Sequence, residues 1–206
     1  ISNLAISGGT LQVDAGATLT ITGTYSTGPG AFFIINNGTI KMQGGALQSF
    51  PGSTASVTSM NNLTINNPFG VNMNKNLSIA GVLTLTSGTF TVGAFSLTIN
   101  NPIAGTPNNL SANQTSSIII AGTSANVNLP SSVTQLNNLT VSNSQGSTLQ
   151  GNLNVKNAVL ISASAGTVNT GLFTFNGTAN LTMNGGNLYM EKNGVVLPEF
   201  TGSYNL

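Results

Sequence analysis

The sequence predicts an all-β protein and, within that class, a parallel β-solenoid with coils of about 20 residues. Three observations lead to this prediction. Apolar and polar residues alternate in short segments, Gly and Asn stand between the segments, and equivalent segments recur at about 20 residues. The helical spacing of apolar residues is sustained nowhere, so we expect almost no helix.

The alternating segments are tripeptides with an apolar, a polar and an apolar residue. Residues i and i+2 of a strand point to the same face, so the apolar pair should face a core and the middle residue should face solvent. Thr suits the middle position because a β-branched side chain fits a pleated surface. The tripeptides are Leu4–Ile6, Leu11–Val13, Leu19–Ile21, Ile40–Met42, Leu63–Ile65, Leu77–Ile79, Leu83–Leu85, Phe90–Val92, Leu97–Ile99, Leu139–Val141, Leu153–Val155, Phe173–Phe175, Leu181–Met183 and Leu188–Met190.

A longer repeat overlies the short one. Asn61–Ile65 recurs 76 residues later as Asn137–Val141, and the same offset takes Gly70 to Gly146. We interpret residues 1–206 as one solenoid domain with an internal duplication, whose copies span about 39–100 and 117–176. Four coils should roughly fill one 76-residue unit.

Period-two alternation assigns faces in both copies, because a slip of one residue would invert every side chain. The sequence predicts that Leu63, Ile65, Leu77, Ile79, Leu139, Val141, Leu153 and Val155 point inward, and that Thr64, Ser78, Thr140 and Asn154 point outward.

The spacing of about 20 residues, as from Leu63 to Leu83 and from Leu77 to Leu97, suits a coil with about three short faces. In a solenoid each coil covers the core of the next, so little apolar sequence per strand suffices. A β-sandwich with antiparallel meanders is the alternative. Short strands, Gly turns and the recurrence favour the solenoid.

Asn directly precedes the Leu that opens a strand at Asn62, Asn76, Asn138 and Asn152. Stacked coils could place these side chains in a hydrogen-bonded ladder. Alternatively, they serve as individual turn residues, since Asn tolerates left-handed backbone conformations.

The composition excludes several functions. Only 3% of the residues are charged, against about 25% in an average soluble domain. Four lysines cannot displace phosphate counterions along a nucleic acid, so we expect no nucleic-acid partner. His and Cys are absent, and Asp14, Glu191 and Glu199 offer no facing pair of carboxylates. We therefore expect no catalytic site, metal or cofactor.

The location of the protein is also constrained. No apolar run approaches the roughly 18 residues of a membrane span. Low charge with abundant Ser, Thr and Asn is typical of exported bacterial surface proteins, so we expect an extracellular or cell-surface location.

Three strings carry a resemblance to known proteins. NNLTINNPFGVNMNKNLSIAGVLTLTSGTFTVG (61–93) and NNLTVSNSQGSTLQGNLNVKNAVL (137–160) resemble the repeats of very large secreted surface proteins of Bacteroidetes. NLAISGGTLQVDAGATLTITG (3–23) resembles the β-helix passenger repeats of bacterial adhesins. The resemblance implies an extracellular, adhesin-like or filamentous stalk, often exported by type IX secretion. The sorting domain of that family is not visible in these residues.

We therefore expect a non-enzymatic structural or adhesive protein, a rod or filament subunit or a stalk segment. The alternative is a solenoid that binds ice or carbohydrate through a Thr- and Asn-rich face. The candidate outward surface comprises Thr20, Thr64, Thr84, Thr91, Thr98 and Thr140.

The apolar segment 195–206 departs from the repeat style and is the candidate cap or assembly segment, with Val195, Val196, Leu197 and Phe200 as its contact residues. It favours head-to-tail self-association or continuation into further repeats. Polysaccharides or surfaces are the other candidate partners.

Overall fold

The structure is a computed structural model that describes residues 1–28, 31–51, 59–162, 164–191 and 200–206. The chain forms two compact units, which are described separately. Unit 1 comprises Ile1–Leu97 and Ile103–Ser111, and unit 2 comprises Thr98–Pro102 and Ala112–Leu206.

The strands of unit 1 are short. They are β1 (Leu4–Ile6), β2 (Gly9–Asp14), β3 (Thr18–Ile21), β4 (Tyr25–Thr27), β5 (Ala31–Asn36), β6 (Thr39–Met42), β7 (Gln48–Phe50), β8 (Ser59–Met60), β9 (Asn62–Asn66), β10 (Val71–Met73), β11 (Leu77–Ile79), β12 (Leu83–Ser87), β13 (Phe90–Thr91), β15 (Ala104–Gly105) and β16 (Leu110–Ser111). β14 (Ser96–Ile99) contributes its first two residues to unit 1 and its last two to unit 2.

Unit 2 contains the two longest strands among the described residues, of seven and nine residues. The strands that lie wholly in unit 2 are β17 (Ser117–Ile120), β18 (Val127–Leu129), β19 (Gln135–Val141), β20 (Ser147–Leu149), β21 (Leu153–Ile161), β22 (Thr167–Asn169), β23 (Phe175–Gly177), β24 (Asn180–Met183), β25 (Asn187–Tyr189) and β26 (Tyr204–Asn205).

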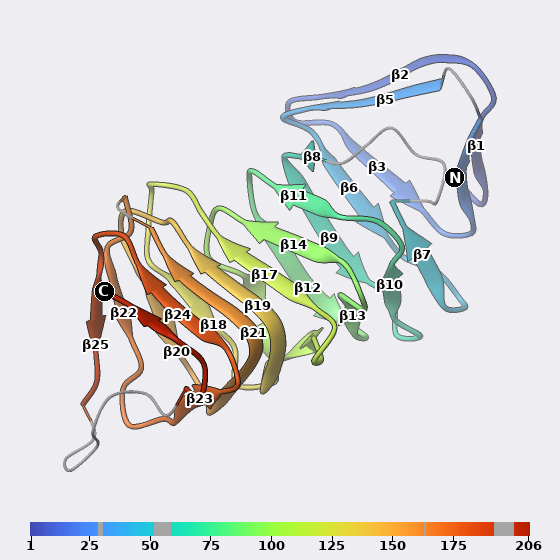
Figure 1. Cartoon of the computed structure of the whole chain (residues 1–206). Coiled ribbons are helices and arrows are strands. Elements are labelled where there is room, and N and C mark those ends of the chain that lie inside the picture. Colours follow the sequence, from blue (N-terminus) through green and yellow to red (C-terminus); the bar gives the residue numbers. More distant parts are fainter. Residues whose placement is uncertain (29–30, 52–58, 163, 192–199) are drawn as a thin grey trace. The chain divides into compact units, whose positions relative to one another are not determined.

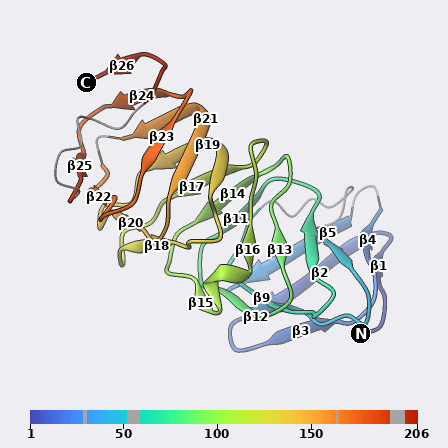
Figure 2. The same ribbon diagram turned by 90° about the horizontal axis from the view of Figure 1, so that it is seen from below.

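The strands pair in parallel with the equivalent strand of the next coil. In unit 1, β3, β6, β9, β12 and β15 form one sheet, and β7, β10, β13 and β16 form another (Figure 1). In unit 2, β17, β19, β21, β24 and β26 follow one another, as do β18, β20, β22 and β25 (Figure 2). The described residues make about eight turns of roughly 21 residues. The predicted parallel β-solenoid is confirmed, and the β-sandwich alternative is wrong.

One coil of unit 1 has three short faces, as the sequence predicts. β9, β10 and β11 follow one another along the chain, and they pair with β12, β13 and β8, respectively, of neighbouring coils. The one helix among the described residues is a 3-10 turn, Pro107–Asn109, with its proline at the first helical position. The described part of the chain contains no helix that is long and apolar enough to cross a membrane.

The core runs inside each unit and includes apolar members of most of the tripeptides, together with residues outside them such as Phe50, Leu110 and Ile118. The expected inward position is wrong at Phe173, which is 36% exposed, and Leu188 and Met190 are only partly buried. All eight residues predicted to point inward are at most 2% exposed. The four residues predicted to point outward are partly exposed, because flanking strands cover their sides. The predicted faces are confirmed at these positions.

The two copies of the repeat use the same strand register. Leu63 pairs with Leu83 in unit 1, and Leu139 pairs with Val159 in unit 2. However, the expectation of four coils per repeat is wrong. With coils of roughly 21 residues, the 76-residue offset corresponds to between three and four coils, so the sequence repeat is not a whole number of structural repeats.

Candidate functional site

Three of the predicted Thr residues lie on one outward row of unit 1. Thr20 of β3 is in register with Lys41 of β6, which is in register with Thr64 of β9 and then Thr84 of β12. All four are partly exposed. A lysine therefore interrupts the hydroxyl row, which is otherwise neutral.

The other three Thr residues lie elsewhere. Thr91 belongs to the sheet of β7, β10, β13 and β16, on a row with Ser49, Asn72 and Ser111. Thr98 and Thr140 lie in β14 and β19, with β17 between these strands in the sheet. Thr140 is flanked in register by two apolar residues, Ile119 and Leu160. The six predicted residues are thus distributed over three sheets and form no single surface.

The predicted assembly segment is only partly described. Val195, Val196 and Leu197 lie outside the described residues. Phe200 is 5% exposed and packs edge-to-face on Phe175, with ring centroids 5.0 Å apart. Its backbone also bridges to Gly177 in parallel. Phe200 is therefore a core residue of its own chain.

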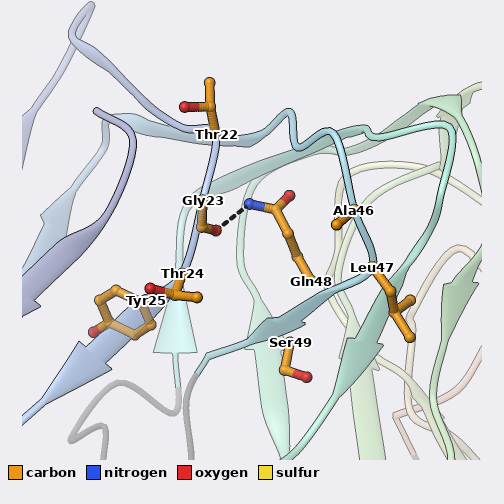
Figure 3. A pocket seen from close by; sticks show the side chains of 8 residues that line it. All are labelled: Thr22, Gly23, Thr24, Tyr25, Ala46, Leu47, Gln48 and Ser49. Atoms are coloured by element: carbon orange, nitrogen blue, oxygen red, sulfur yellow. Dashed lines mark hydrogen bonds between the residues drawn. The ribbon is translucent and has the colours of Figure 1, made fainter.

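A pocket of about 270 Å³ lies between two successive coils of unit 1 (Figure 3). Its lining consists of Thr22–Tyr25 from one coil and Ala46–Ser49 from the next. None of these eight residues carries a charge at neutral pH. Burial also raises the pKa of the Tyr25 phenol above its usual range. Leu47, by contrast, is 58% exposed at the rim.

The amide of Gln48 joins the two coils at the wall of this pocket. Gln48 Nε2 donates to the carbonyl oxygens of Gly23, at 2.6 Å, and Ile21, at 3.1 Å (Figure 3 draws the first bond). Gln48 Oε1 accepts a bond from Asn67 Nδ2 at 3.0 Å. Both side chains are buried, so these bonds offset the cost of removing two amides from water. The Gln48 amide at the pocket wall therefore already uses its hydrogen-bonding groups to join neighbouring coils.

Asn67 has an equivalent in the second copy of the repeat. Asn67 donates to Ala46 O at 2.8 Å and accepts from Phe69 N at 3.0 Å. The residue 76 positions later, Asn143, donates to Ala125 O at 2.9 Å and accepts from Gln145 N at 2.8 Å. Both are fully buried.

Each of these buried asparagines belongs to a turn that ends in a glycine with positive φ. The N–H of Gly70 donates to Asn67 O and that of Gly146 donates to Asn143 O; their φ angles are +90° and +85°. We did not predict the asparagines from the sequence. The two asparagines lie 76 residues apart, and each is followed three residues later by a glycine. This repeated pattern is the sequence signal that points to them.

A second group of asparagines links each coil to the following one. In five places the side-chain Oδ1 of an Asn that precedes a Leu accepts the backbone N–H of the residue 20 to 23 positions later, at 2.9 Å each time. We call these bonds the asparagine clamps. The pairs are Asn3 with Thr24, Asn62 with Val82, Asn76 with Ser96, Asn152 with Thr174, and Asn180 with Ser203.

The fourth Asn of the predicted set behaves differently. Asn138 donates to Ser117 Oγ at 3.0 Å and accepts from Asn157 Nδ2 at 2.8 Å. A side-chain ladder therefore exists at Asn138, whereas Asn62, Asn76 and Asn152 bond to backbone. In both forms the amide supplies a hydrogen bond between neighbouring coils.

The side chains of the two described acidic residues accept hydrogen bonds from neighbouring amide side chains. Asp14 accepts bonds from Gln12 Nε2 at 2.5 Å and Asn36 Nδ2 at 3.2 Å. Glu191 accepts one from Asn169 Nδ2 at 3.4 Å. Glu199 lies outside the described residues. Within the described part of the chain, no three His, Cys, Asp or Glu side chains lie close enough to hold a metal ion.

Comparison of the chain with protein-family models, with curated proteins and with solved structures finds no match.

Proposed function

We propose that this chain is a non-enzymatic structural and adhesive segment of a bacterial surface protein, working outside the cell as part of a stalk or filament. The observation that carries the proposal is the use of its polar side chains. The buried amides of Gln48, Asn67 and Asn143 and the asparagine clamps bond coil to coil, and the chain as a whole carries only four lysines and three acidic residues.

The proposed role follows from how such a stack bears load. Within each unit, parallel strands and an apolar core join neighbouring coils, and the clamps add bonds between some of them, so a force on one coil is shared with its neighbours. In this role the segment is continued by further coils, either in the same chain or from a second copy joined head to tail.

Ice or carbohydrate binding is the second candidate, and one observation favours it. Thr20, Thr64 and Thr84 lie on the same outward row of one sheet. Changing Thr64 and Thr84 together to Leu should abolish ice shaping or retention on a polysaccharide resin if this row is the contact surface. Thr91→Leu, on another sheet, is the matched control.

The adhesive part of the proposal is tested with the purified, fluorescently labelled chain. Its retention on intact bacterial cells and on neutral polysaccharides should change little between low and high salt, because screening acts on charges and the chain has four lysines and three acidic residues. An antibody against the chain should also label intact cells of the source bacterium.

Two results would contradict the proposal. A steep loss of retention with salt would indicate an electrostatic site around the lysines. Labelling that requires permeabilised cells would place the chain inside the cell and rule out a role on the surface.

A further inference from the structure

The chain contains four Asn–Gly pairs, a sequence that is chemically labile because glycine offers no side chain to hinder attack by its own backbone nitrogen. The structure describes three of them, Asn37–Gly38, Asn176–Gly177 and Asn184–Gly185. The fourth, Asn193–Gly194, lies outside the described residues. The three described pairs differ sharply in their surroundings.

We propose that Asn184 is a modification site that deamidates spontaneously in the folded protein, whereas Asn37 and Asn176 are protected by the solenoid. In the reaction, the backbone nitrogen of Gly185 loses its proton and attacks the side-chain carbon Cγ of Asn184. Ammonia leaves, and water opens the resulting succinimide to give aspartate or isoaspartate.

Asn184 meets the requirements of this reaction. It lies in the turn between β24 and β25, and both Asn184 and Gly185 are exposed. The backbone N–H of Asn184 donates to Ile161 O at 2.9 Å. Among the described residues, neither the side chain of Asn184 nor the N–H of Gly185 makes a hydrogen bond, so both reacting groups can move.

Asn37 is exposed, but its partner Gly38 is not. Gly38 is buried so tightly that a Cβ atom there would lie 2.6 Å from Val13 O and 2.8 Å from Asp14 O. The Gly38 carbonyl also accepts a bond from Asn62 N. Ring closure would require the Gly38 peptide to swing away from the preceding coil, which this packing opposes.

Hydrogen bonds hold both the Asn176 side chain and the Gly177 peptide in place. The Asn176 Oδ1 accepts a bond from Asn154 Nδ2 at 3.1 Å, and the Asn176 backbone, in β23, pairs with that of Asn154 in β21. The Gly177 carbonyl accepts a bond from Thr201 N at 2.9 Å. The reaction at Asn176 therefore requires local opening of a strand pair.

Deamidation at Asn184 changes the molecule measurably. One new carboxylate takes the formal net charge from +1 to zero. Isoaspartate also inserts a methylene group into the backbone just before Gly185, and the next residue, Gly186, is tightly packed: a Cβ there would lie 2.7 Å from Ile161 Cγ2. We expect the pairing of β25 with β22, for example Val168 with Leu188, to loosen, with faster hydrogen exchange at Leu188.

The experiment is peptide mapping by mass spectrometry after incubation of the intact chain at neutral and mildly alkaline pH. In the folded protein Asn184 should deamidate about tenfold faster than Asn37 and Asn176, because their reaction waits for local opening. In concentrated urea the three rates should converge. The rate at Asn184 should rise with pH, since the attacking nitrogen must be deprotonated.

A matched pair of variants tests the charge change. Asn184→Gln should remove the corresponding acidic band in native isoelectric focusing, and Asn187→Gln, in which the changed residue precedes Leu rather than Gly, should leave it. The proposal is overturned if Asn37 or Asn176 reacts as fast as Asn184 in the folded protein, or if Asn184 does not react there at all.

Discussion

The two copies of the duplicated segment keep their interior and change their exterior. Leu63 and Ile65 of β9 pair with Leu83 and Leu85, and the copies of these residues in β19 and β21 pair in the same register. The buried Asn turn is also kept. The outward pair is not, because Thr64 faces Thr84 in unit 1 while Thr140 faces Leu160 in unit 2. The kept features are those that stack the coils.

One difference in sequence between the copies coincides with a difference in local structure. Gly81 of unit 1 corresponds to Asn157 of unit 2. In unit 1 a Cβ at position 81 would collide with Asn61 and Asn62, and β11 and β12 are separate strands. In unit 2 the Asn157 side chain donates to Asn138, and the two segments merge into the nine-residue β21. The backbone clamp of unit 1 is thus replaced by a side-chain ladder in unit 2, with Asn157 as one of its members.

The largest effect should come from the shared core. Leu63→Ala and Leu139→Ala should each lower the free energy of unfolding by about 2–5 kcal/mol, because both side chains are at most 1% exposed and truncation leaves a cavity. Urea denaturation followed by circular dichroism measures the change. A loss near zero in either copy would show that the assigned face is wrong there.

Substitution of the buried asparagines should have the next largest effect on the free energy of unfolding, and the effect should differ between the two copies. Asn143→Ala removes the partners of Ala125 O and Gln145 N and should cost about 1–3 kcal/mol. Asn67→Ala should cost more, since it also removes the partner of Gln48 Oε1. Equal losses in urea denaturation would mean that the Gln48 bond contributes nothing.

Asn143→Asp provides a pH-dependent version of the same test. Burial raises the pKa of the new carboxyl group above its value in the unfolded chain. The folded state therefore binds the proton more tightly, and the variant should lose stability as pH rises through the raised pKa. The wild-type chain has Asn there and serves as the control. Parallel stability curves against pH for the two proteins would contradict the burial of this site.

Removing a clamp or the ladder should lower the free energy of unfolding less than removing a buried asparagine, and the two losses should differ. Asn62→Ala leaves the Val82 N–H without its acceptor and should cost about 0.5–1.5 kcal/mol. Asn138→Ala removes only bonds between side chains near the surface, which water replaces, and should cost less. Asn62→Asp retains the Oδ1 acceptor and should restore most of the loss. Failure of the aspartate to do so would rule out the clamp as the cause.

The outward residues should have the smallest effect. Thr64→Ala and Thr140→Ala are each expected to change the free energy of unfolding by no more than about 0.5 kcal/mol, since both side chains are partly exposed. A loss at Thr140 comparable with that at Leu139 would contradict the alternation of faces in β19.

The sequence predicts those features that depend on neighbouring residues. Alternation at Leu63–Ile65 identifies the buried face, and the recurrence at Leu83 identifies the coil. The distribution of the Thr residues over three sheets is harder to predict because coil length varies. Ile40 pairs with Leu63, 23 residues on, whereas Leu63 pairs with Leu83 after 20.

The buried polar residues could not be found from local pattern for a related reason. Gln48 and Asn67 are amides in turn-rich sequence, where exposure is the usual expectation. Their burial arises only when neighbouring coils stack and place the carbonyl oxygens of Gly23 and Ala46 within reach. The offset between Asn67 and Asn143 was available in the sequence, but its chemical meaning was not.

The central claim, that the chain is a structural segment whose coils are locked together, is tested most directly by one distance. The chain contains no Cys, so spin labels can be attached at Ala17→Cys and Thr86→Cys, two exposed positions in different coils of unit 1. Double electron–electron resonance then measures the distribution of distances between the labels. A locked segment predicts a single narrow distribution that persists in moderate urea until the cooperative transition. A broad distribution in the absence of urea would show that the coils of unit 1 are not locked together and would contradict the account.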